Sequence, residues 1–190
     1  IRKRWNLFLQ VTAGFALTLS SWYAAWHYGS APFAVWTCFV PFLAVSTALM
    51  FGNWSQHAFV CPVNPRCNYR LTYAVLNHPD NQRSYNDGFH TLHHANSMIH
   101  WSEFPAKFIE KLDEHAARDA LVFNEIGFFH VGLALFFKAH GYLADHYVNV
   151  GQPKRTREEL IALMKERLRP MRSWGNKDEF PESKKATKAA

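Results

Sequence analysis

Three histidines stand close together in the segment His90-Thr91-Leu92-His93-His94. On a helix, residues three and four positions apart return to nearly the same face, so this spacing directs the imidazoles into one pocket. Neutral imidazole is a ligand for iron, copper, nickel and zinc, whereas magnesium and calcium prefer oxygen. The chain holds 11 histidines among 190 residues, so a second element is needed before the triplet indicates a transition-metal site.

A polar pair upstream supplies that element. Asn53 and His57 are four residues apart at the end of an apolar segment, so on a helix they share one face. For His57 alone, a solvated helix end is the simpler explanation. Together with the triplet, the pair predicts a shared metal centre. Five further histidines lack such spacing and are interpreted as surface or core residues: His78, His115, His130, His140 and His146. His100 is disfavoured as a ligand.

The segment that precedes these ligands has the composition expected of membrane-spanning helices. No Lys, Arg, Asp or Glu occurs from Trp5 to Pro65, and a soluble surface rarely lacks charge over such a length. Residues 7–28 and 31–51 are apolar runs, and each reaches the roughly 20 residues that cross a bilayer. Aromatic side chains gather at the turn between them, as they do at membrane interfaces. The runs predict a transmembrane helical hairpin, in preference to a secretory signal or a buried helical pair.

Basic residues flank both runs, and the turn between the runs carries none. The positive-inside rule then places both ends of the hairpin, and the polar remainder, on the cytosolic side, or on the matrix or stromal side of an organelle. We therefore expect an integral membrane protein. The basic residues are Arg2, Lys3 and Arg4 before the first run and Arg66 and Arg70 after the second.

The polar remainder is expected to be helical. Residues 69–76 are interpreted as a helix and 119–139 as a core or interfacial helix. Thr156 and Glu159 form a capping-box pattern that opens an amphipathic helix before Pro170. Residues 171–190 are expected to be a loosely ordered tail. The predicted fold class is all-α, a transmembrane hairpin (1–52) followed by a cytosolic-side, His-rich metal-binding domain (53–150) and an amphipathic helix with a basic tail (151–190).

The segment Gly88-Phe89-His90-Thr91-Leu92-His93-His94, followed by Ile99, Trp101, Ser102 and Pro105, resembles a known pattern. It is similar to the last histidine box of the membrane fatty-acid desaturases, hydroxylases and sphingolipid desaturases, G-[YF]-H-x-x-H-H then I-x-W-S-x-x-P. Asn53 and His57 match the additional N-x-x-x-H ligand motif that this family places after a transmembrane helix. The resemblance covers about residues 5–110.

The resemblance implies an O₂-dependent, histidine-ligated di-iron centre that abstracts hydrogen from a fatty-acyl lipid. Asn53 would act as a ligand through water or as an outer partner. Asp87 would accept a ring N–H of His90 and fix its tautomer, and its alternative role is an exposed helix N-terminal acid. The implied iron ligands, and hence the catalytic residues, are His57, His90, His93 and His94.

Partners follow from the same resemblance. Electrons would come from a cytochrome b5-like or ferredoxin-like donor, and the substrate from membrane lipid, in the endoplasmic reticulum or an organelle membrane. No nucleic-acid partner is expected. A set of basic residues would attract an acidic donor or lipid headgroups, or form a plain solvated face. These residues are Lys107, Lys111, Arg118, Lys154 and Arg155.

The chain also departs from the family pattern. An upstream H-x-x-x-H box and a central H-x-x-H-H box are missing before His57, where the only histidine is His27. Four histidines do not complete a two-iron site, so we expect the missing ligands to precede Ile1, with a second chain or an incomplete site as alternatives. Alternative functions are a non-catalytic desaturase-like subunit of a larger membrane complex and a lipid hydroxylase. A zinc hydrolase is disfavoured because no H-E-x-x-H pattern is present.

Overall fold

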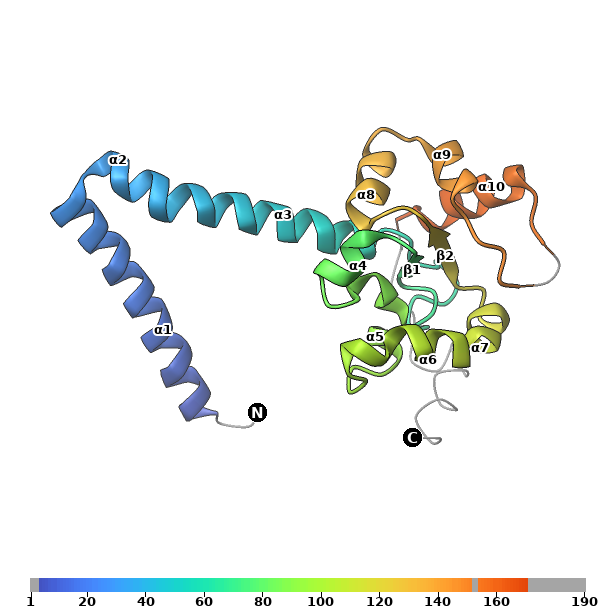
Figure 1. The fold of residues 1–190 in the computed structure, drawn as a ribbon, viewed down its shortest axis with the longest axis horizontal. Helices are drawn as coiled ribbons and strands as arrows, with labels where there is room; N and C mark the ends of the chain where they lie inside the picture. Colours follow the sequence, from blue (N-terminus) through green and yellow to red (C-terminus); the bar gives the residue numbers. More distant parts are fainter. Residues whose placement is uncertain (1–3, 152–153, 171–190) are drawn as a thin grey trace. The chain divides into compact units, whose positions relative to one another are not determined.

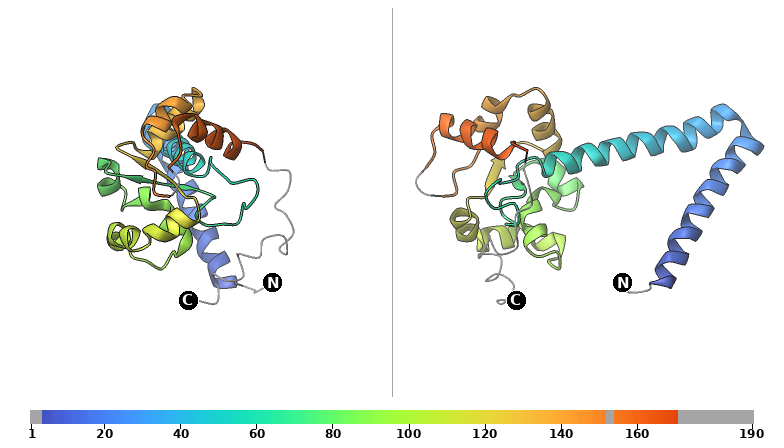
Figure 2. Two further views of the ribbon diagram at one scale, coloured as in Figure 1. Left: turned by 90° about the vertical axis from the view of Figure 1, so that its right-hand side faces the viewer. Right: turned by 180° about the vertical axis from the view of Figure 1, so that it is seen from behind.

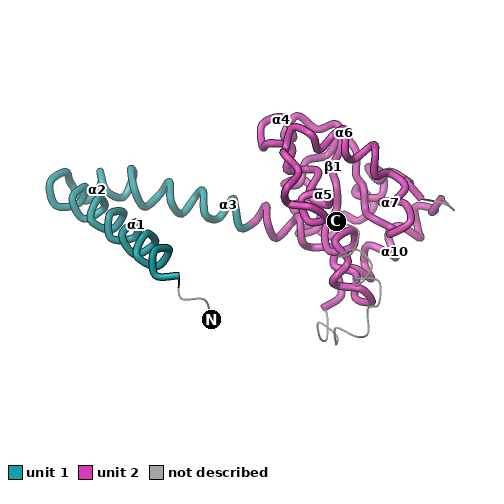
Figure 3. Tube along the Cα trace, turned by 90° about the horizontal axis from the view of Figure 1, so that it is seen from below, with its two compact units in different colours: residues 1–50 teal, residues 51–190 magenta. Residues whose placement is uncertain are grey.

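The computed structural model describes residues 4–151 and 154–170. The chain divides into two compact units, Ile1–Met50 and Phe51–Ala190 (Figure 3), and each is treated by itself below. The helices are α1 (Trp5–Ala24), α2 (Ala31–Ala34), α3 (Val40–Gln56), α4 (Pro79–Arg83), α5 (His90–Ala95), α6 (Phe104–Glu110), α7 (Leu112–Ala117), α8 (Phe128–Phe136), α9 (His140–Asp145) and α10 (Arg157–Arg167). The strands are β1 (Tyr73–Leu76) and β2 (Leu121–Asn124).

The first unit is helical, with an interruption at Ser30. The backbone of Ser30 is extended, and its hydroxyl accepts the Phe33 N–H at 3.2 Å, which caps the start of α2. Wider, π-helical turns adjoin this point at Ala25–Gly29 and Val35–Phe39. None of the side chains of α1 is buried. The apolar residues of this unit therefore lack a protein core of their own.

One helical segment in the described part of the chain is long and apolar enough to cross a membrane. It runs from Ala31 to Gln56 over 26 residues, or about 39 Å at 1.5 Å per residue, against a hydrocarbon core of about 30 Å. A second span over 7–28 stays a prediction.

The second unit is mostly helical, as predicted, and also contains a two-stranded parallel sheet that the sequence analysis did not predict. Strands β1 and β2 pair from Tyr73 opposite Leu121 to Leu76 opposite Asn124. The predicted helix over 69–76 is wrong, because its second half is β1. The single helix predicted over 119–139 is also wrong, because that stretch holds β2, a turn and α8. Short apolar runs buried on both faces have no alternating pattern, so periodicity does not separate them from helices.

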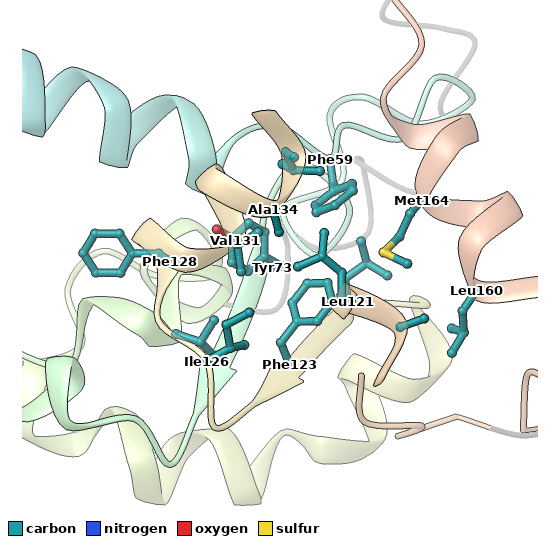
Figure 4. Packing of buried hydrophobic residues seen from close by; sticks show 14 residues of the cluster. Phe59, Tyr73, Leu121, Phe123, Ile126, Phe128, Val131, Ala134, Leu160 and Met164 are labelled. Carbon is teal, nitrogen blue, oxygen red and sulfur yellow. The ribbon is translucent and has the colours of Figure 1, made fainter. Parts of the chain in front are cut away.

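Helices cover both faces of this sheet (Figures 1 and 2). Successive side chains of a strand point to opposite faces, so Tyr73 and Phe123 join one core and Ala74 and Val122 join another. Figure 4 shows the first core, where strand residues meet side chains of α8 and α10. The second core packs the strands against Phe89, Leu92, Phe104 and Phe108. The histidine helix α5 thereby rests on the sheet through Leu92, which is fully buried.

The last described helix agrees with its sequence signal. The Thr156 hydroxyl accepts the Glu159 N–H at 3.3 Å, and the Glu159 carboxylate accepts the Thr156 N–H at 2.8 Å. This reciprocal pair is the predicted capping box, and α10 follows it. The predicted tail over 171–190 lies outside the described residues.

Candidate metal centre

Three imidazoles meet where α3 ends and α5 begins. His57 follows the last residue of α3, and His90 and His94 lie one turn apart on α5. The three Nε2 atoms form a nearly equilateral triangle: His57 to His90 is 3.2 Å, His57 to His94 is 3.3 Å, and His90 to His94 is 3.3 Å. The structure therefore joins the two elements that the sequence analysis paired.

This triangle fits a metal ion better than it fits hydrogen bonding. A neutral imidazole Nε2 either donates one hydrogen or offers one lone pair, so at most one of the three Nε2 pairs can form a hydrogen bond. Two nitrogens bound to one tetrahedral ion at about 2.0–2.1 Å lie roughly 3.3–3.4 Å apart, close to the observed separations. The donor set of His57, His90 and His94 therefore matches one imidazole-binding transition metal.

Asp87 orients one ligand. Its Oδ1 lies 3.2 Å from His90 Nδ1, and a hydrogen bond from that Nδ1–H leaves the His90 Nε2 with the lone pair that metal binding requires. Burial raises the pKa of Asp87, but the hydrogen bonds from His90 and Gln56 outweigh it, so the pKa of this carboxyl lies below its ordinary value. The predicted contact between Asp87 and His90 is therefore present in the structure.

Gln56 is the partner that the sequence analysis missed. Its side chain is buried, and its amide donates to Asp87 Oδ2 at 2.8 Å and to the Asp87 carbonyl at 3.3 Å. The backbone carbonyl of Gln56 accepts a hydrogen bond from the buried Thr72 hydroxyl at 2.6 Å. The available signal was a lone amide next to His57 at the end of an apolar helix. A solvated helix end gives the same local pattern, so only the fold identifies its role.

The surroundings of His57 and His94 favour the neutral form of both imidazoles. Burial and the neighbouring His90 and His57 lower the pKa of His94 to about 4. Burial and His90 lower the pKa of His57, against a hydrogen bond with the Leu71 backbone that raises it. Both imidazoles are therefore unprotonated at neutral pH. Unprotonated imidazole is the form that binds metal.

Gly88 sets the close approach of the histidine helix to the sheet. A Cβ at this position would collide with the side chains of Asn81 and Val75. Asn81 is itself buried and donates to the Val75 carbonyl at 2.9 Å. Only glycine therefore lets the turn at Asp87–Phe89 lie directly on β1.

The remaining predicted ligands lie apart from the triangle. His93 is exposed, and its ring centroid is 5.7 Å from those of His90 and His94. It lines an open cavity of about 670 Å³, together with Asp87, Trp101 and Phe104. Asn53 lies one turn before His57, and its side chain is exposed. The roles of His93 as an iron ligand and of Asn53 through water stay predictions.

Several of the predicted basic docking residues pair with acids of the same chain. Lys107 contacts Glu110 at 2.6 Å and Lys111 contacts Glu114 at 3.4 Å. The Arg155 guanidinium binds the Asp119 carboxylate. These pairs reduce the charge available to an acidic partner.

A cluster of three histidines that could hold a metal ion thus follows a helix that is long and apolar enough to cross a membrane. The fatty acid desaturase family model matches residues 1–127. The chain therefore belongs to the fatty acid desaturase family. Comparison with curated proteins and with solved structures gave no significant match.

Proposed function

We propose that this chain carries part of the catalytic centre of a membrane fatty-acyl lipid desaturase. The observation that carries the proposal is the triangle of His57, His90 and His94 Nε2 atoms, 3.2–3.3 Å apart, in a member of the desaturase family. Bound iron would supply the O₂-dependent oxidation that removes two hydrogens from an acyl chain, with two electrons and two protons completing the reduction of O₂ to water.

The protein's own contribution is to hold and orient the ligands. Asp87 keeps the proton of His90 on Nδ1, and Gln56 holds the Asp87 carboxylate in place. Thr72, fully buried, holds the Gln56 backbone carbonyl. His93 faces the open cavity and is proposed as a further iron ligand. A two-iron centre needs more ligands than these four histidines, so the proposal requires additional ligands from outside this set.

Membrane insertion through residues 1–52 belongs to the same proposal. In α1, the hydroxyls of Thr18 and Ser21 donate to backbone carbonyls of their own helix at 3.0 and 2.7 Å. Such bonds satisfy polar groups where water is absent. The apolar side chains of this helix are exposed, including Phe15, Leu17 and Leu19. Lipid is the surrounding that covers such a surface at least cost.

Helix α8 is proposed to lie at the membrane face. Its exposed apolar residues recur at helical spacing: Phe129, Leu133, Phe136 and Phe137. The Phe129 ring stacks on Phe51 near the end of α3, with centroids 6.1 Å apart. An apolar stripe beside the end of the candidate span suits an interfacial helix. The second unit would then face the cytosol, or the matrix or stroma of an organelle.

The electron donor is proposed to be a cytochrome b5-like or ferredoxin-like protein. The cavity beside His93 is open to solvent and adjoins the centre through Asp87. A donor bound at this cavity would bring electrons close to the ligands. Any donor surface would use the cavity rim more than the paired lysines of α6 and α7.

The test supplies a saturated acyl lipid, O₂ and a reducing system to membranes that contain the complete gene product. Mass spectrometry then distinguishes loss of two hydrogens, the desaturase outcome, from gain of one oxygen, the hydroxylase outcome. His94→Ala should abolish product and lower bound iron together. Iron-free protein that co-purifies with other membrane proteins and makes no product would instead support a non-catalytic subunit.

A further inference from the structure

A second cluster of ligands lies at the carboxyl edge of the sheet. Leu76 ends β1 and pairs with Asn124, which ends β2. Because the strands are parallel, the segments that follow β1 and β2 both leave the sheet at this edge. Across the edge, Asn77 Nδ2 donates a hydrogen bond to Asn124 Oδ1 at 2.7 Å. His78 follows β1 directly beyond Asn77, and His130 lies in the first turn of α8 after β2.

The ligand atoms of His78, Asp80 and His130 all lie within 4.8 Å of one another. The ring centroids of His78 and His130 are 5.3 Å apart. His78 Nδ1 is 3.3 Å from Asp80 Oδ2. Neither histidine has a ligand-like neighbour at helical spacing in the sequence, and His130 lies beyond the residues that the family model matches. The cluster exists only because the strands pair.

The Nδ1 atom of His78 has two neighbours in Asp80, the backbone N–H and a carboxylate oxygen. It accepts the backbone N–H of Asp80 at 3.3 Å, while the Asp80 carboxylate lies 3.3 Å from the same nitrogen. One imidazole nitrogen cannot accept one hydrogen bond and donate another at the same time. When it accepts, its single lone pair is used by the Asp80 N–H. A metal ion bound at this nitrogen would replace that N–H and would be shared with the Asp80 carboxylate oxygen 3.3 Å away.

Gly127 leaves room for such an ion. Its φ of −88° is accessible to any residue, so the backbone conformation does not require glycine. The lack of space requires glycine, because a Cβ would lie 2.7 Å from Asp80 Oδ2 and 2.9 Å from His78 Cε1. The backbone at the start of α8 therefore passes close over two of the three ligands.

We propose that His78, Asp80 and His130 bind a divalent transition-metal ion, separately from the tri-histidine centre. Two imidazoles and one carboxylate are a donor set that suits Zn²⁺ or Fe²⁺. The ligand atoms of His78, Asp80 and His130 lie within 4.8 Å of one another. Two nitrogens bound to one tetrahedral ion are closer, at about 3.3–3.4 Å. The exposed His130 side chain closes on the ion when it binds. This proposal does not depend on the desaturase activity.

The test counts zinc bound to the full-length protein after chelator treatment and titration with ZnCl₂. His130→Ala should remove one zinc equivalent, and the exposed position of His130 makes a folding defect an unlikely cause. Gly127→Ala keeps all three ligands but fills the space, and should weaken the same equivalent at least ~10-fold. His140→Ala removes a partly exposed histidine of α9 and serves as the matched control.

Zinc-dependent thermal stabilisation gives a second readout. The wild type and His140→Ala should show a two-step rise in Tm with zinc, and His130→Ala only one step. His94→Ala should lose the other step. The proposal is overturned if His130→Ala and Gly127→Ala bind as much zinc, and as tightly, as the wild type.

Discussion

The side-chain amide of Gln56 donates a 2.8 Å hydrogen bond to Asp87 Oδ2. This bond ties the last residue of α3 to the carboxylate that orients His90. It thereby connects the end of an apolar helix with a helix that begins more than thirty residues later, and it fixes how the two ligand-bearing segments meet.

Gln56→Ala should weaken iron binding about 10–100-fold, the range for partners that orient metal ligands. The change frees the Asp87 carboxylate and leaves the histidines in place. Iron content per protein after dialysis against a weak chelator measures the effect. Gln82→Ala, at an exposed position of α4, is the matched control. Equal iron retention in both variants would show that Gln56 does not support the centre.

His94→Ala and His93→Ala should separate the two neighbouring histidines. His94 is a corner of the Nε2 triangle, so its loss should remove the ion held there. His93 is exposed outside the triangle, so His93→Ala should retain that ion while losing acyl oxidation. Iron analysis and the product assay measure the two effects. Loss of all iron from His93→Ala would show that the four histidines act as one ligand set.

Ser55→Ala should lower the free energy of unfolding by about 1–3 kcal/mol. The Ser55 hydroxyl is fully buried, donates to the Phe128 carbonyl at 2.6 Å and lies 2.9 Å from the Tyr73 hydroxyl. Its removal takes one hydrogen-bond partner from the Phe128 carbonyl and one from the buried Tyr73 hydroxyl. Denaturant titration in detergent measures the change. Ser46→Ala, on the same helix and partly exposed, should stay within ~0.5 kcal/mol of the wild type.

His115 should make stability depend on pH. Burial lowers the pKa of His115 below its ordinary value of 6.5, and its buried Nε2 has no hydrogen-bond partner within residues 4–151 and 154–170. Below about pH 6.5, His115 binds a proton in the unfolded chain but stays neutral in the folded chain. The free energy of unfolding therefore falls as pH decreases. His115→Phe should flatten this dependence between pH 6.5 and 5.

The unfolding midpoint measured at several pH values checks this expectation. His140→Phe, which removes a partly exposed histidine, should keep the slope of the wild type. A His115→Phe variant with the wild-type slope would assign the pH dependence to other groups.

Part of the centre was readable from local spacing. Residues at offsets of three and four share a helical face in any fold, so the pairing of His90 with His94 followed from the segment alone. The start of α10 was readable for the same reason, since a capping box is a contact between close neighbours. The separate position of His93 was not readable, because neighbouring offsets do not show which imidazole the core turns outward.

The sequence by itself determined the family, the apolar span before His57 and the ligand types, because these depend on composition and short-range spacing. Only the tertiary structure decided that Gln56 supports Asp87, that β1 pairs with β2, and that His78 meets His130. The physical reason is strand pairing. The backbone hydrogen bonds of β1 have their partners in β2, beyond four helices, and no local pattern near Tyr73 names Leu121 as its neighbour.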